Sequence, residues 1–349
     1  MYIFLLYAHN ITSKNINMVR NDNMTYKRTD LALEQTELYK ESTPEKADID
    51  GVEIDEETKN DIKITRVKVL DENGERLISK PVGSYITLEA QTLNYMTKES
   101  YEDICLALKN ELEALVRIDL SKPVLVVGLG NRNITADSLG PKTVEQLFVT
   151  RHLFEQMPEL VGEETTSVCA IAPGVLGITG IETMEIVKGV VNKVSPGLVI
   201  AVDALAARKL ERINTTLQIS DTGINPGSGV GNNRKAINRN TLGVDVISIG
   251  VPTVVDAITM SNDTLDMTLD AIRASGKEDD GILSLIEKMS SEEKYSLIQR
   301  VLAPTIGDMV LTVKEVDMSM NKISKIIAGA INKFLQKNMT FDEIESFAL

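Results

Sequence analysis

The sequence predicts an α/β protein in which helices cover both faces of a twisted, mainly parallel sheet. From residue 123 onward, short apolar segments alternate with segments of helical periodicity, which is typical of strand–helix units in an open sheet. A β-rich section at 31–98 precedes this α/β core, which spans 99–349, and is expected to pack on it within a single domain. Because 43% of the 349 residues are hydrophobic, the chain can bury a large core.

Periodic patterns define the elements expected along the chain. In the front section, alternation predicts strands at 62–70 and 83–89, with a turn at 71–74. The segment 41–61 carries nine acids against two bases, which is typical of a solvated loop or a solvated face. Further strands are expected at 123–129, 167–172, 198–203, 215–220 and 244–250. Helices are expected at 99–118, 141–156, 179–193, 204–212, 254–273 and 319–336.

Composition excludes several classes of function. The net charge of −14 and the pI of about 4.8 disfavour direct contact with nucleic acid phosphates. No apolar stretch reaches the roughly 18 residues of a membrane span, and the apolar start at 1–8 is too short for a signal peptide. Cys105 and Cys169 match no metal or redox spacing and indicate a reducing compartment. A cytoplasmic protein is therefore expected.

The chain has few histidines to act as catalytic bases or metal ligands, because it contains only His9 and His152. His152 falls on a predicted helix and is interpreted as a surface or half-buried residue rather than a catalytic base. A zinc hydrolase or a Ser-His-Asp triad would need more histidines than this. No metal and no cofactor is therefore predicted from the residues.

Two aspartates follow apolar strands and form the predicted catalytic pair. Asp137 lies in the turn region after the strand at 123–129, and Asp203 ends the strand at 198–203. Because ligands bind at the carboxyl ends of strands in such sheets, the two carboxylates are expected to meet there. Each has a structural alternative, a turn cap for Asp137 and a helix N-cap for Asp203. Asp256 is a third candidate, ranked lower as a helix-start residue.

A close pair of carboxylates suits the hydrolysis of a peptide bond. Because two negative charges at close range repel each other, ionising both carboxyl groups costs free energy. One group therefore keeps its proton while the other acts as a base on water. The protonated partner can then polarise the scissile carbonyl. Which aspartate holds the proton stays open at this point.

Two glycine-rich segments are predicted to line the site. Gly128, Gly130 and Asn131 follow a strand, but position 133 is Asn, so the third glycine of a dinucleotide fingerprint is missing. They are interpreted instead as a sharp turn that brings backbone N–H groups to the sheet edge. The second segment, 225–235, lacks the Gly-Lys-Ser/Thr of a phosphate loop. It is either a tight loop or a wall of the site, with Gly227, Gly229 and Gly231 as substrate-binding candidates.

At several segments the chain resembles the germination protease family of spore endopeptidases. The likeness runs from about residue 28 to the last helix. The matching segments are Arg28–Ala32, Val126–Asn131, Thr135–Lys142, Thr150–Glu155, Ala172–Gly177, Gly180–Thr183, Ala201–Arg208, Pro226–Asn232, Pro252–Asp256 and Val313–Asp317.

The resemblance implies an atypical aspartic endopeptidase that initiates degradation of small acid-soluble spore proteins in the spore core during germination. Family members have two proposed catalytic aspartates, which correspond here to Asp137 and Asp203. The fold is similar to that of hydrogenase maturation endopeptidases, so a metal-dependent peptidase using the same carboxylates is the alternative. The resemblance also implies a homotetrameric zymogen that removes its own N-terminus.

The family's substrates are cut after the first acid of a segment resembling Thr-Glu-hydrophobe-Ala-Ser-Glu. Thr29–Glu34 of this chain, Thr-Asp-Leu-Ala-Leu-Glu, is similar to that segment. The resemblance therefore predicts a propeptide at 1–30, released by a cut between Asp30 and Leu31. The alternative is that this segment only begins a helix.

Overall fold

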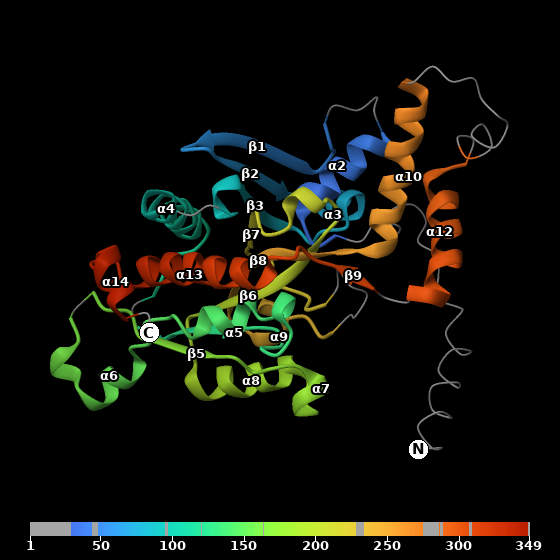
Figure 1. Cartoon of the computed structure of the whole chain (residues 1–349). Helices are drawn as coiled ribbons and strands as arrows, with labels where there is room; N and C mark the ends of the chain where they lie inside the picture. The colour runs from blue at the N-terminus through green and yellow to red at the C-terminus, as the bar shows by residue number, and fades with distance from the viewer. Residues whose placement is uncertain are drawn as a thin grey trace.

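The computed structural model describes residues 29–347, with gaps at 44–47, 95–96, 120, 163, 228–233, 275–285, 287–288 and 307–308. Within these residues the strands form one nine-stranded sheet, ordered β1-β2-β3-β7-β8-β6-β4-β5, with β9 (Val310–Leu311) paired to β8 (Figure 1). The α/β class is confirmed, and the sheet is mixed. None of the helices described is long and apolar enough to cross a bilayer.

The half of the sheet that runs from β8 to the edge strand β5 is parallel. It comprises β8 (Asp245–Asp256), β6 (Leu198–Ala207), β4 (Val124–Gly128) and β5 (Val168–Ile171). Alternate residues of β6 point to opposite faces. Ile200 and Val202 join the core that contains α4 (Lys98–Leu115) and α13 (Val316–Leu335), whereas Val199 and Ala201 pack against α8 (Thr183–Val194). Helices therefore cover both faces, as predicted.

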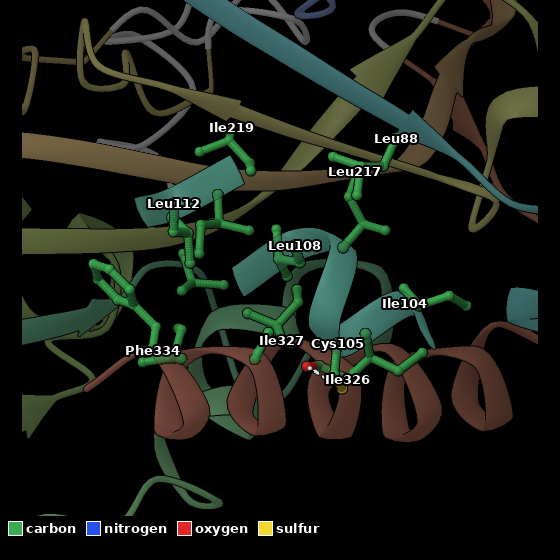
Figure 2. Close-up of a cluster of buried hydrophobic side chains, with 14 of the residues drawn as sticks. Leu88, Ile104, Cys105, Leu108, Leu112, Leu217, Ile219, Ile326, Ile327 and Phe334 are labelled. Carbon is green, nitrogen blue, oxygen red and sulfur yellow. Dashed lines mark hydrogen bonds between the residues drawn. The ribbon is translucent and has the colours of Figure 1, made fainter. Parts of the chain in front are cut away.

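The larger core lies between the sheet and the pair α4 and α13 (Figure 2). Leu108 and Ile327 are fully buried there, and Cys105 donates its thiol hydrogen to the carbonyl of Ile326, with 3.4 Å between Sγ and oxygen. The apolar stripes predicted at 99–118 and 319–336 are thus the faces that meet the sheet. Both Cys105 and Cys169 are free thiols.

The front section extends the same sheet instead of forming a separate layer. β1 (Val52–Lys59), β2 (Ile62–Val69) and β3 (Gly83–Glu89) are antiparallel, and β3 pairs with β7 (Thr216–Ser220). Of the two alternatives for the acidic segment, residues 52–59 form the solvated face, because they are an exposed edge strand and not a loop. Its acids are balanced by Arg66, which bonds Asp55 at 3.0 Å and Glu57 at 2.9 Å. Such charged side chains also keep an edge strand from pairing with other chains.

The predicted turn at 71–74 is wrong, because α3 (Glu72–Ile78) begins there. Asp71 is its N-cap, and its carboxylate accepts the backbone N–H of Gly74 at 2.9 Å. Asp, Asn and Gly favour turns and helix starts alike, so local composition could not separate the two. The predicted helix at 141–156 is also two helices, α5 (Leu139–Val144) and α6 (Arg151–Gln156), and His152 is exposed on α6.

The predicted helix at 204–212 is the correction that matters most for the site. Residues 204–207 continue β6 and pair with β8, and only Leu210–Arg212 form a short 3₁₀ helix. Ala204–Ala207 has high helix propensity, but β8 offers it the backbone partners of a strand, and tertiary pairing overrides the local preference. Consequently β6 reaches well beyond the end of β4.

Candidate active site

The site is built where β4 ends and β6 continues. In the last hydrogen bond between the two strands, the backbone N–H of Leu129 donates to the carbonyl of Val202 at 2.8 Å. The chain then turns away into the 3₁₀ helix η2 (Thr135–Asp137), which carries Asp137. The Thr253 hydroxyl, at a register shift in the β6–β8 pairing, donates to the carbonyl of Ala136 at 2.7 Å. The sheet thereby holds the loop that carries Asp137.

Gly128 and Gly130 have different roles in that turn. Gly130 lines the site with a φ of +109°, and a Cβ there would lie 2.1 Å from the backbone oxygen of Asp137. Gly128 faces α5 instead, where a Cβ would meet the carbonyl oxygen of Gly140 at 2.2 Å. Only glycine permits both close approaches. The turn predicted from these residues is present, and Gly128 serves packing within it.

Asp203 lies in the interior of β6, so it caps no helix. Its carboxylate is only 4% exposed and accepts the backbone N–H of Ala204 at 2.9 Å. Burial raises the pKa of Asp203 well above its usual range, and the charge of Asp137 raises it further, while the Ala204 N–H opposes the shift. Asp203 is thus held in its protonated form.

Asp137 is half-buried beside it. The backbone N–H of Asn131 donates to Oδ2 of Asp137 at 2.8 Å and to its backbone oxygen at 2.9 Å. Burial raises the pKa of Asp137 to about 6, against the lowering effects of that N–H and of Arg234. The two aspartates therefore differ in acidity, and Asp137 ionises first.

Both carboxylates line one cavity of about 220 Å³. Its walls are largely apolar and include Leu129, Ile134 and Val175, which explains why burial dominates both pKa shifts. Gly227 also lines the cavity, while Gly229 and Gly231 lie outside the described residues. Asp256 does not line it. Oδ2 of Asp256 accepts the N–H and the hydroxyl of Thr259, both at 2.9 Å, as the expected helix-start residue.

A third acid, Asp30, lines the same cavity. Its backbone N–H donates to the carbonyl of Ala206, and its carboxylate accepts the N–H of Ala206, both at 2.9 Å. Its charge contributes to the raised pKa of Asp203. Asp30 therefore occupies the edge of β6 that β4 leaves open, and the residue before the bond predicted for cleavage shares a cavity with the two aspartates.

The segment after Asp30 is firmly anchored. Leu31 is fully buried among Leu205, Ala207 and Val255, and α2 (Ala32–Ser42) begins directly after it. Buried Glu34 accepts the backbone N–H of Arg208 at 2.7 Å and of Lys209 at 3.0 Å.

Arg212 ties the same helix to the sheet. Its guanidinium contacts Glu34 at 3.2 Å, Glu37 at 2.6 Å and Glu89 of β3 at 3.1 Å. Burial raises the pKa of Glu37, but Arg212 and Lys209 outweigh it and lower the pKa overall. The helix that follows the predicted cut is thus tied to the sheet by its own side chains.

Sequence reasoning missed Arg234, which lines the cavity, and also Lys80 and Gln218, which donate hydrogen bonds to the carbonyl of Asp30. Lys80 lies in a Ser-Lys-Pro loop and Gln218 within a strand, and neither pattern indicates a site. Arg234 lies near the end of the glycine-rich segment 225–235. The glycines there indicated a tight loop or a wall of the site, but nothing in the pattern indicated a role for a charged side chain. Among the described residues, no group of three or more His, Cys, Asp or Glu side chains could hold a metal ion.

Comparisons with known proteins agree on one family. The sequence model of the germination protease family matches residues 29–283 and 274–348. The chain is 48% identical over 320 residues to a germination protease of Clostridium tetani, covering 92% of this chain and 98% of that one. It is 50% identical over 317 residues to that of Caldanaerobacter subterraneus, covering 91% and 96%. The protein of Oceanobacillus iheyensis, 41% identical over 357 residues, covers 92% and 97%.

The fold and the site define an α/β protein with paired carboxylates in an apolar pocket at the carboxyl ends of its parallel strands. Matches of this extent and identity identify it more closely. The chain belongs to the germination protease family, and it is a peptidase.

Proposed function

We propose that this peptidase is an atypical aspartic endopeptidase, made as a zymogen that cuts its own Asp30–Leu31 bond. The observation that carries the proposal is that Asp30 lines the same cavity as Asp137 and Asp203. The residue after which the family resemblance predicts a cut thus shares a cavity with the two groups predicted to make it. Two hydrogen bonds to Ala206 hold it at the edge of β6: one from the backbone N–H of Asp30 to the Ala206 carbonyl, and one from the Ala206 N–H to the Asp30 carboxylate. The first is the kind of backbone bond by which an added substrate strand is held.

The pKa shifts assign a role to each aspartate. Asp137, with a pKa of about 6, is the base that draws a proton from water. Asp203 has the more strongly raised pKa and keeps its proton as the acid. Water adds to the Asp30 carbonyl carbon, the C–N bond breaks, and the Leu31 nitrogen takes up a proton.

The proposed substrates in trans are small acid-soluble spore proteins, cut at the start of their degradation in the germinating spore. The support is the likeness of Thr29–Glu34 to the segment at which such substrates are cut. A substrate acid placed where Asp30 lies would meet the Ala206 N–H in the same way. The net charge of −14 suits an enzyme that acts on DNA-binding proteins without binding DNA. Location in the spore core and assembly as a homotetramer belong to the same proposal.

Mass spectrometry of the full chain incubated at mildly acidic pH tests the proposal. We expect a new N-terminal Leu31 in the wild type and none with Asp137→Asn or Asp203→Asn. Asp245→Asn, an exposed acid at the start of β8, is the matched control and should mature normally. Near-full processing by either pocket variant would refute the proposed pair. Processing that a strong chelator stops and a metal ion restores would favour the metal-dependent alternative.

A further inference from the structure

The carbonyl oxygen of Asp30 is bound by two side-chain donors that do not themselves line the aspartate pocket. Lys80 Nζ lies 2.7 Å from this oxygen, and Gln218 Nε2 lies 3.2 Å from it. These residues line a second cavity of about 120 Å³, and Asp30 lines both cavities. Asp30 thus lines the cavity of the two aspartates, while its carbonyl oxygen is bound by a pair of donors from the neighbouring cavity.

We propose that Lys80 and Gln218 form the oxyanion site for cleavage of the Asp30–Leu31 bond. This inference rests on the proposed function, and it adds two catalytic residues to it. Donors that already contact the carbonyl stabilise the negative charge that develops on its oxygen when water adds to the carbon. The water proton goes to Asp137. The oxyanion then collapses, the C–N bond breaks, and Asp203 protonates the departing Leu31 nitrogen.

The surroundings of Lys80 fit this role. Burial lowers the pKa of Lys80, while the carboxylates of Asp30 and Glu34 oppose that shift. A poorly hydrated ammonium interacts strongly with a nearby developing charge. The loop that carries Lys80 is fixed by Tyr85, whose hydroxyl donates to the carbonyl of Pro81 at 2.9 Å. Lys80 therefore reaches the carbonyl from a backbone that is already held in place.

Gln218 is oriented by a second bond. Its Oε1 accepts the backbone N–H of Ala32 at 2.7 Å, which leaves Nε2 directed at the Asp30 carbonyl. Gln218 thus contacts both sides of the bond to be cut. Because Lys80 and Gln218 polarise the carbonyl, Asp203 is not needed for that role. Its proton is therefore available to the leaving nitrogen.

The first-order rate of appearance of N-terminal Leu31 tests the inference, measured on the full chain by mass spectrometry. We expect Lys80→Met to slow processing about 10²- to 10³-fold. Gln218→Glu keeps the acceptor for Ala32 but loses the donor, and should slow processing at least about tenfold. Lys68→Met, at an exposed position on β2, is the control and should mature at the wild-type rate.

Hydrogen exchange across residues 29–36 separates catalysis from docking. The inference requires slow processing in both variants with exchange as protected as in the wild type. Wild-type rates in both variants would overturn it. Slow processing that accompanies loss of protection would also overturn it, because the donors would then only hold the segment. A wild-type chain that never gains N-terminal Leu31 would overturn the proposed function as well, whereas maturation unaffected by Lys80→Met would overturn this inference alone.

Discussion

Asp30 and Ala206 are joined by two hydrogen bonds of 2.9 Å, although 176 positions separate them in sequence. One joins backbone to backbone, and the other joins the Ala206 N–H to the Asp30 carboxylate. Because Ala206 lies beyond the end of β4, this edge of β6 is open to an incoming chain. The contact brings the start of the described chain to the pocket of Asp137 and Asp203.

The rate of cleavage should follow a bell-shaped dependence on pH. It rises through about pH 6 as Asp137 loses its proton, and it falls at a higher pH where Asp203 loses its own. Initial rates with a synthetic peptide that matches residues 26–38 measure this profile. A rate that stays constant from pH 4 to pH 8 would be inconsistent with the assigned roles.

The ionisation of Asp137 should also lower the stability of the fold. Its pKa is raised from 3.8 to about 6 in the folded state, so its contribution is fully present below about pH 3.8 and is lost as the pH rises through about 6. The shift corresponds to about 3 kcal/mol. We compare Asp203→Asn with Asp137→Asn/Asp203→Asn, because neither should process itself. In urea unfolding, the single variant should lose stability relative to the double variant between pH 4 and pH 7.

The backbone of Gly130 cannot take a side chain. At a φ of +109°, with a Cβ only 2.1 Å from the Asp137 carbonyl oxygen, Gly130→Ala should cost about 1–3 kcal/mol. It should also reduce cleavage about 10²-fold, because it displaces Asp137. Gly189→Ala in α8 is the control, since nothing lies within 4 Å of a Cβ there, and it should be neutral or stabilising by about 0.5–1 kcal/mol. Thermal unfolding measures stability and peptide cleavage measures activity. Equal effects of the two substitutions on both would contradict the role given to Gly130 in positioning Asp137.

Arg212 should be essential for stability. Arg212→Met leaves buried Glu34 without its guanidinium partner and releases Glu37 and Glu89, so the free energy of unfolding should fall by about 3–5 kcal/mol. Arg239→Met removes an ion pair with Asp245 on the surface and should cost less than about 1 kcal/mol. Urea unfolding measures both. A loss at Arg212 no larger than at Arg239 would mean that the buried network contributes little.

Much of the fold follows from local pattern. Fully apolar runs such as Val124–Gly128 predicted the buried parallel strands, and the spacing of Leu108 and Leu112 predicted the buried face of α4. The predictions failed where the local residues suit more than one conformation and the surrounding structure selects the other one. Ala204–Ala207 favours a helix, but β8 supplies the backbone bonds of a strand. Asp71 suits a turn or an N-cap, and the chain after it is helical.

The sequence by itself determined the class of fold, the apolar faces of its main helices and the residue types available for chemistry, because these depend on periodicity and composition. It also supplied Asp137, Asp203 and Asp30 as candidates. Only the tertiary structure decided that all three line one cavity and that Lys80 and Gln218 meet the Asp30 carbonyl. Such contacts join segments that are far apart in sequence. The local pattern of residues in each segment does not say which other segment it will pack against.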